Sequence, residues 1–213
     1  MQKCDKYTSL LDALRAAAYP VRRKDLRRAA ALMSASFHDD PSIRYLLGGT
    51  DEGADDWRYF YTILRAIYGK TVILSTGEDM TGLLILFPPW RKTVPTLGFM
   101  LGGGLVLRRY FGADIYRRSM SYEGNCQRIK ARLSPRGAWY CMCFVVVPER
   151  QERGVGSRLI RPALAELDAR HIPLYLETHK AVNVELYRHL GFRTADVSSI
   201  PGTNITQYAM LRE

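Results

Sequence analysis

The segment Cys143–Ser157 joins an apolar, β-branched run to a helix through a loop that contains glycine. Its first part, Phe144–Val147, predicts a buried strand, and Pro148–Arg153 predicts a charged turn. Gly154 and Gly156 then open a stretch with helical periodicity. A strand–loop–helix junction presents unpaired N–H groups and the positive end of a helix dipole to one point, which suits a phosphate group. Taken alone, the loop indicates phosphate and nothing more specific.

Two common phosphate-binding motifs do not fit this loop. A dinucleotide-binding fingerprint needs G-x-G-x-x-G and an acidic residue about 20 positions further on, whereas the chain has Gln151-x-x-Gly154-x-Gly156. A P-loop needs a lysine in a Gly-Lys-Ser or Gly-Lys-Thr end, and none follows here. The ligand of the predicted site has to be inferred from the residues that follow.

Two further segments come after the loop. Leu174–Thr178, with the sequence L-Y-L-E-T, predicts a strand that carries Glu177, and Asn183–Leu190 predicts a short helix. Asn183 and Tyr187 are four positions apart, so they lie on one face of that helix. The order is therefore strand, glycine loop, helix, strand, helix.

Together, the runs V-V-V-P-E-R-Q-E-R-G-V-G-S-R-L-I, Y-L-E-T and N-V-E-L-Y-R-H-L-G-F resemble the GCN5-related N-acetyltransferases (GNAT superfamily). More narrowly, they look like the subgroup similar to puromycin N-acetyltransferase. The resemblance extends over residues 139–192, with a weaker echo at 30–41. It implies an acyl-CoA N-acyltransferase fold, acetyl-CoA as the donor, and direct transfer of the acetyl group to an amine without a covalent enzyme intermediate.

The resemblance also implies roles for single residues. Asn183 would contact or orient the end of the pantetheine arm. Tyr187 would lie beside the thioester sulfur and protonate the departing thiolate, and a thiol with a pKa near ~8.5 needs only a modest acid. Strand-like pairing with the pantetheine arm would come from the backbone of Val145, Val146 and Val147. The pyrophosphate would be held at Gln151, Arg153, Gly154, Val155, Gly156 and Ser157.

The attacking amine must be neutral, so the reaction needs a base. Glu177 is our candidate, because a carboxylate in a mostly apolar strand can have a raised pKa; a structural carboxylate paired with an arginine is the alternative. Tyr187 has its own alternative as a core tyrosine. His179 shares the strand face of Glu177 and could relay protons, but the sequence favours a solvated loop histidine. His38-Asp39-Asp40 either lines the acceptor pocket or caps a helix.

The whole pattern predicts a single domain over 1–213, with 1–138 on the acceptor side and 139–213 on the acetyl-CoA side. Hydrophobic residues make up 47% of the 213 residues, enough for a real core. We expect an α/β (α+β) fold, a mixed and mostly antiparallel twisted sheet flanked by helices. A helical region is expected within Val21–Leu47: Asp25 caps it, His38-Asp39-Asp40-Pro41 interrupts it, and Pro41 can start a second short helix. The other expected helices are Asp55–Tyr68, a weakened one near Leu97–Leu105, Tyr110–Arg132, 154–170 and Asn183–Leu190. The expected strands are Thr71–Ser75, Leu83–Phe87, Trp139–Val147, Pro173–Thr178, Phe192–Thr194 and Ile205–Leu211.

The formal net charge is +10, which would suit a nucleic-acid surface or a polyanionic cofactor. The arginines occur as scattered pairs, so we expect no nucleic-acid partner. Cys141 and Cys143, two apart on a strand, are expected to be thiols that fill space on one face, with no metal site. No apolar run is long enough for a membrane span, and the N-terminus lacks a signal-peptide pattern, so we expect a cytoplasmic protein with no membrane partner.

The sequence leaves the acceptor open. The expected partners are acetyl-CoA and a small amine, with the protein as a monomer or a homodimer. Two alternatives remain, a non-catalytic acyl-CoA-binding or regulatory module and a transferase that acts on a protein or peptide amine. Aromatic residues of the first half would suit an aromatic or apolar amine, although core packing explains them equally well: Trp57, Tyr61, Trp90 and Tyr110.

Overall fold

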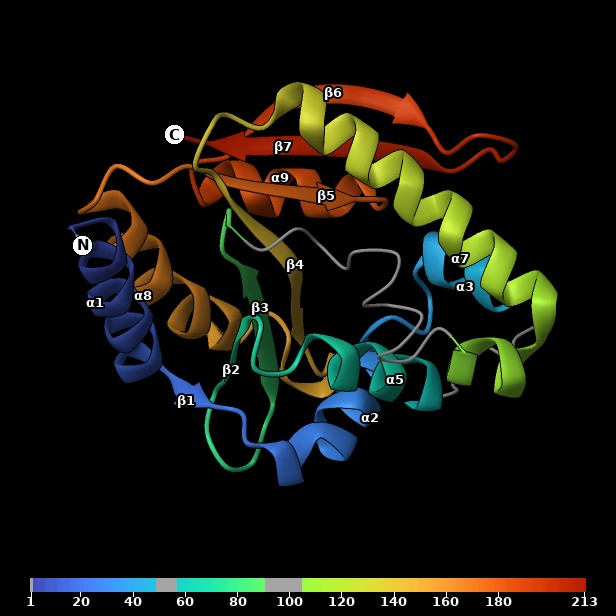
Figure 1. The fold of residues 1–213 in the computed structure, drawn as a ribbon, viewed down its shortest axis with the longest axis horizontal. Coiled ribbons are helices and arrows are strands. Elements are labelled where there is room, and N and C mark those ends of the chain that lie inside the picture. Colours follow the sequence, from blue (N-terminus) through green and yellow to red (C-terminus); the bar gives the residue numbers. More distant parts are fainter. Residues whose placement is uncertain (1, 49–56, 91–104) are drawn as a thin grey trace.

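The computed structural model describes residues 2–48, 57–90 and 105–213 (Figure 1). Within them one twisted sheet has the strand order β1-β2-β3-β4-β5-β7-β6. Every neighbouring pair is antiparallel except β4 and β5, which are parallel. This confirms the predicted mixed, mostly antiparallel sheet. The strands are β1 (Tyr19–Pro20), β2 (Val72–Ser75), β3 (Gly82–Phe87), β4 (Trp139–Val146), β5 (Leu174–Thr178), β6 (Arg193–Ser199) and β7 (Thr206–Arg212).

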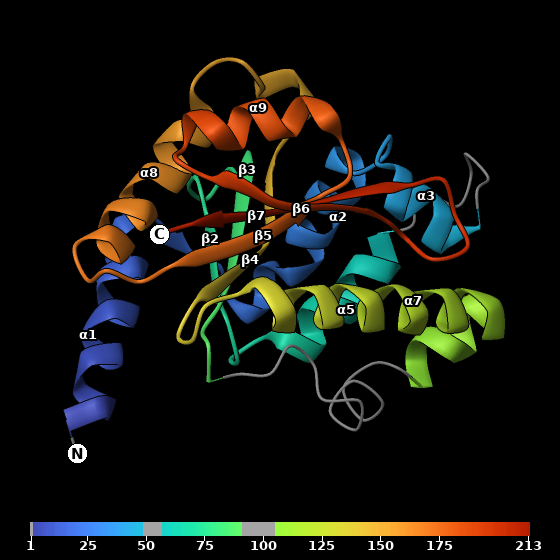
Figure 2. The same cartoon turned by 90° about the horizontal axis from the view of Figure 1, so that it is seen from above.

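Helices cover both faces of the sheet (Figure 2). One face packs against α1, α8 and α9, and the other against α2, α5 and α7. Each face therefore has its own hydrophobic core, with the sheet as the shared wall. The helices are α1 (Gln2–Ala17), α2 (Leu26–Ser36), α3 (Pro41–Leu47), α5 (Trp57–Ile67), α7 (Leu105–Leu133), α8 (Val155–Asp168) and α9 (Ala181–His189).

The N-terminal helical region is interrupted where the sequence predicts, between the end of α2 at Ser36 and the start of α3 at Pro41. The region within Val21–Leu47 forms two helices, α2 and α3, because Asp40 and Pro41 start a new one: the Asp40 carboxylate accepts from the N–H of Ser42 at 2.9 Å, and Pro41 occupies the first helical position. Asp25 occupies the N-cap position of α2 as predicted, but its side chain caps no helix N–H and instead accepts from the backbone N–H of Arg22 at 3.3 Å.

The long helix α7 confirms the helix predicted over Tyr110–Arg132 and adds a break. Gly112 has φ 83° and ψ 172°, so two helical pieces meet there at an angle that a glycine accommodates. The weakened helix predicted near Leu97–Leu105 lies almost entirely outside the described residues. No helix in the described part of the chain is both long and apolar enough to cross a bilayer.

A bulge in β4 overturns the expectation that Cys141 and Cys143 share a face. Ile85 of β3 lies opposite Cys143 and Leu86 lies opposite Cys141, so Met142 is the extra residue. As a result Cys141 packs with the α1/α8/α9 core and Cys143 with the α2/α5 core. Both are buried free thiols, as predicted.

Candidate active site

The parallel strands β4 and β5 pair along only part of their length. Trp139, Tyr140 and Cys141 lie opposite the first residues of β5, and β4 then continues to Val146 without this neighbour. The chain therefore leaves one edge of the second half of β4 open. An open edge of this kind can pair with an extended ligand that carries amide groups.

The register of β4 shows which backbone groups face that edge. The N–H of Val147 donates to the carbonyl of Thr81 at 2.9 Å, so this group faces β3. Backbone groups alternate between the two edges of a strand, so Val145 also faces β3, whereas Phe144 and Val146 face the open edge. The carbonyl of Val146 accepts from the side-chain amide of Gln151 at 3.0 Å.

Beyond this edge, the loop and the start of α8 form an anion-binding geometry. A 3-10 turn at Pro148–Arg150 leads to Gly154, whose φ of 71° requires the left-handed region. Among the described residues no side chain caps α8, so the first N–H groups of this helix, at Val155, Gly156 and Ser157, lack intrahelical partners. Gln151 and Arg153 are exposed on the loop.

A cavity of about 220 Å³ begins at the open edge and extends between β5, α3, α5 and α7. It is lined by residues of both halves of the chain, because β4 and β5 supply one wall and the N-terminal helices supply the other. The lining includes Phe37, Asp40, Ile43, Leu46, Phe60, Ile63, Met120, Tyr122, Glu123, Glu177, His179, Asn183 and Tyr187.

Tyr187 lies on α9 and lines the cavity while also packing in the core. Its ring is 6.5 Å from that of Phe144 and 5.6 Å from that of Phe192, centroid to centroid. Burial raises the pKa of Tyr187 well above its usual value, and nearby thiols act in the same direction. The hydroxyl therefore carries its proton at neutral pH and is able to donate it.

Glu177 lies on β5 at the same cavity. Burial raises the pKa of Glu177 to about 7, although the hydroxyls of Tyr140 and Tyr175 act in the opposite direction. Its Oε1 atom is buried without a hydrogen-bond partner among the described residues. No arginine ion pair of Glu177 occurs in this part of the chain, so the arginine-paired alternative gains no support.

These arrangements match a known domain. Residues 121–194 match the family model for the acetyltransferase (GNAT) domain. An uncharacterised N-acetyltransferase of Schizosaccharomyces pombe is 25% identical over 185 residues, which cover 83% of this chain and 74% of the relative. The chain is therefore similar to the GNAT N-acetyltransferases, and residues 121–194 carry the match.

Solved structures share the fold of this chain. A Corynebacterium glutamicum structure described as histone acetyltransferase HPA2 and related acetyltransferase has a TM-score of 0.61 at 19% identity, covering 91% of this chain and 93% of that one. Arylalkylamine N-acetyltransferase 2 of Aedes aegypti has a TM-score of 0.59 at 11% identity, covering 91% and 96%. At such identities the likeness shows the fold alone.

Two residues at the cavity have different surroundings from those that the sequence favoured. His179 is not a solvated loop residue, because it lines the cavity and its Nε2 lies 3.3 Å from the hydroxyl of Tyr122. Burial lowers the pKa of His179, while Asp40 acts against this. Asp40 fits both roles considered for it, because it caps α3 and also lines the cavity.

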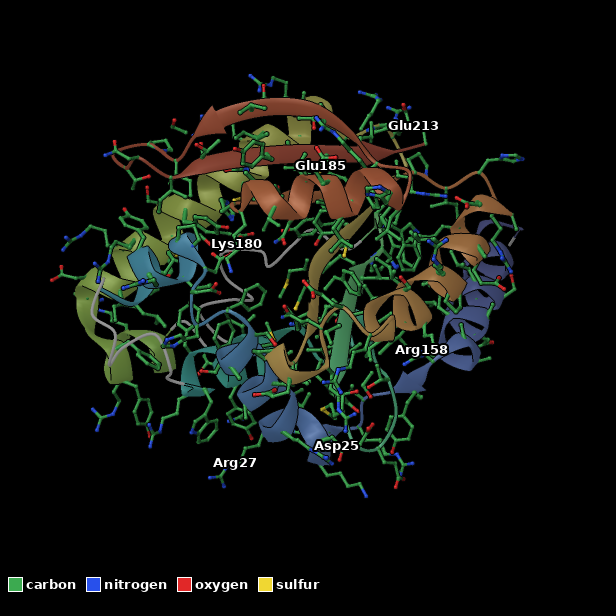
Figure 3. All side chains as sticks on the ribbon, turned by 180° about the vertical axis from the view of Figure 1, so that it is seen from behind. Asp25, Arg27, Arg158, Lys180, Glu185 and Glu213 are labelled. Atoms are coloured by element: carbon green, nitrogen blue, oxygen red, sulfur yellow. The ribbon has the colours of Figure 1, made fainter. Side chains whose placement is uncertain are left out.

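The two halves of the chain are also joined beside the cavity. Lys180, at the start of α9 (Figure 3), donates to the carboxylate of Asp39 at 2.5 Å. On the inner side, the amide nitrogen of Asn183 donates to Thr178 Oγ1 at 3.2 Å. Asn183 thus lies between β5 and the cavity with a fixed orientation.

The sequence did not predict most of the acceptor-side wall of this cavity. Trp57, Tyr61 and Trp90, the aromatics considered for it, are not lining residues, and neither is Tyr110, which is 71% exposed. The lining aromatics of that side are Phe37, Tyr59, Phe60, Phe87 and Tyr122. Helical periodicity marks several of these residues as buried, but it does not separate a core side chain from one that lines a cavity. No cluster of metal-ligating side chains occurs in the described ranges.

Proposed function

We propose that this chain is an acetyl-CoA-dependent N-acetyltransferase that moves an acetyl group directly to the amine of a small molecule. The observation that carries the proposal is that Tyr187 and Glu177 line one cavity, and that this cavity starts at the open edge of β4. A single domain would bind both substrates: residues 139–213 would hold the acetyl-CoA donor, and residues 1–138 would shape the binding site of the amine acceptor.

The donor would be held along a continuous path. Its pyrophosphate would lie against the N–H groups of Val155, Gly156 and Ser157, beside the exposed Gln151 and Arg153. Its amide-containing arm would pair with the open edge of β4. Since the N–H of Val147 is already bonded to Thr81, we assign this pairing to the backbone of Val146, flanked by the side chains of Val145 and Val147, and not to the N–H of Val147.

Acetyl-CoA supplies an activated acyl group, and the side chains of this chain move the protons. Glu177 takes a proton from the incoming ammonium, so that a neutral amine nitrogen is available to bond to the thioester carbon. As the carbon–sulfur bond breaks, Tyr187 gives its proton to the sulfur, and the second proton lost by the nitrogen that becomes the amide restores the Tyr187 hydroxyl. Asn183, fixed by Thr178, orients the donor next to Tyr187. The proton on Glu177 then leaves to solvent.

The donor site is best tested at Ser157, the third residue of α8. Ser157→Asp places a carboxylate where the pyrophosphate would lie, yet a carboxylate at a helix N-terminus favours the helix by about 0.3–1 kcal/mol. We expect calorimetry to show acetyl-CoA binding at least about tenfold weaker for Ser157→Asp, with no loss of thermal stability. The neutral control Ser157→Asn should bind within about threefold of wild type. Equal binding by the aspartate variant would refute this location of the site.

Acetyl transfer itself is tested by following free thiol release from acetyl-CoA in the presence of amines. The expected result is amine-dependent release above the rate with acetyl-CoA alone. Binding of acetyl-CoA without transfer to any of four amines (2-phenylethylamine, n-hexylamine, spermidine and a short peptide with one lysine) would contradict the proposed reaction.

A further inference from the structure

The acceptor end of the cavity has a charge pattern of its own. Its described lining contains three carboxylates, those of Asp40, Glu123 and Glu177, and neither lysine nor arginine. This is the reverse of the net charge of the chain, which is +10. A cavity with this lining attracts a cation and repels a carboxylate or a phosphate.

The three carboxylates are not equally available. Asp40 is occupied within α3, where its Oδ1 accepts from Ser42 N at 2.9 Å, from Ser42 Oγ at 2.5 Å and from Ile43 N at 3.3 Å. Glu123 accepts from the side-chain amide of Gln127 at 2.6 Å. Only Glu177 has a buried oxygen, Oε1, without a hydrogen-bond partner among the described residues, although the hydroxyls of Tyr140 and Tyr175 and the ammonium of Lys130 also act on this carboxylate. The cavity therefore offers one buried carboxylate oxygen for one ammonium group.

The wall opposite this carboxylate is apolar. Phe37 and Phe60 stack with their ring centroids 5.8 Å apart at an interplanar angle of 18°. Ile43, Leu46, Ile63 and Met120 continue the surface. A wall of this kind favours a flat or compact apolar group, and aromatic rings gain further from offset or edge-on contacts. The described residues of this apolar wall offer no carboxylate to pair with a second ammonium group of the acceptor. Burying such an unpaired charge is costly.

The size of the cavity limits the acceptor further. Its volume is about 220 Å³, below the roughly 300–1,000 Å³ of pockets that enclose drug-sized ligands. One ring and a short linker fit this space better than an extended chain does. We infer that the acceptor is a primary monoamine whose single ring, most favourably aromatic, packs against Phe37 and Phe60 while its ammonium group binds Glu177. This inference rests on the proposed N-acetyltransferase function.

The test compares four classes of amine with the full chain and acetyl-CoA. The probes are 2-phenylethylamine, n-hexylamine, spermidine and a short peptide with one lysine. We expect kcat/KM for 2-phenylethylamine to be at least about tenfold higher than kcat/KM for spermidine or for the peptide. It should also be higher than kcat/KM for n-hexylamine, but by a smaller factor. Spermidine or the peptide as the best acceptor would overturn the inference but leave the proposed function intact. Failure of acetyl-CoA to bind would instead refute the proposed function.

A second variant pair tests the charge argument directly. Met120 lies on α7 in the apolar part of the lining and is only partly buried. Met120→Glu adds a second carboxylate there, and Met120→Gln is the matched neutral control. The ratio of kcat/KM for 1,5-diaminopentane to that for 2-phenylethylamine should rise at least about fivefold in the glutamate variant only. An equal change in both variants, or none in either, would contradict the placement of the ring at this wall.

Discussion

A Cβ atom on Gly156 would lie 3.0 Å from Cζ of Phe144 and 3.4 Å from Cγ2 of Val146. The glycine therefore lets the first turn of α8 pack directly on the open half of β4. Because this half of β4 is also the proposed donor-binding edge, the packing fixes the distance between the phosphate loop and the strand. Gly156 has a structural role whatever ligand the loop binds.

Gly156→Ala should lower the free energy of unfolding by about 1–3 kcal/mol, because the methyl group overpacks against an aromatic ring. Gly124 is the matched control, since it is helical in α7 and nothing lies within 4 Å of its Cβ position. Gly124→Ala should stabilise the protein by about 0.5–1 kcal/mol. Urea denaturation measures both, and equal changes would contradict the close packing.

Tyr187→Phe should lower kcat by about 10²–10⁴-fold, because it removes the proposed proton donor. The ring contacts with Phe144 and Phe192 remain, so the Kd for acetyl-CoA should change by less than about threefold. Tyr208→Phe is the control, since Tyr208 packs against the same core but does not line the cavity. Steady-state kinetics and calorimetry separate the two effects, and an unchanged kcat would rule out the acid role.

The second half of the chain could be predicted from its sequence because its signals are local. The apolar run of β4, the turn at Pro148 and the apolar stripe of α8 lie within about 30 consecutive residues, and the structure confirms each element. The resemblance to the GNAT superfamily came from this segment together with the L-Y-L-E-T strand and the helix of Asn183 and Tyr187. The puromycin-like subgroup stays a resemblance, since the comparisons do not resolve it.

What the sequence did not show depends on contacts between distant residues. The bulge at Met142 arises from pairing with Ile85 and Leu86, more than fifty positions away. The surroundings of His179 depend on Tyr122 of α7. Such contacts leave no trace in local periodicity, so the acceptor-side wall and the faces of the two β4 cysteines required the structure.

Asn183 should orient the donor through its hydrogen bond to Thr178 Oγ1, at 3.2 Å. Asn183→Ala removes the amide, whereas Thr178→Val removes only its acceptor and keeps the shape of the strand residue. We expect the KM for acetyl-CoA to rise about tenfold in the first variant and about threefold in the second, in line with one hydrogen bond of about 0.5–1.5 kcal/mol. Val182→Ala, at a position that is 74% exposed on the same helix, should have no effect. A larger rise of the KM for acetyl-CoA in Thr178→Val than in Asn183→Ala would contradict the proposal that Thr178 acts through Asn183.

The raised pKa of Glu177 should appear in the pH dependence of both stability and activity. Burial moves this pKa from 4.5 to about 7, so between these pH values the native state retains a proton that the unfolded chain has lost. The stability from this group is therefore complete below pH 4.5 and falls as the pH rises through about 7, by up to about 3 kcal/mol. Glu177→Gln removes the titrating group and with it this pH dependence. The free energy of unfolding of the variant, relative to that of wild type, should therefore increase from pH 4.5 to about 7 and level off above that pH.

Activity should follow the opposite course, because the base must be ionised to accept a proton. In wild type, log kcat/KM should rise with pH through an apparent pKa of about 7 and then level off. Because the fraction of neutral amine also rises with pH, the rates are first corrected for that fraction. In Glu177→Gln this rise should disappear and the remaining rate should be at least about a hundredfold lower. Glu185→Gln, on the exposed face of α9, is the control for both measurements. A Glu177→Gln variant that keeps the inflection near pH 7 would assign the base to another group, and His179 would then be the next residue to replace.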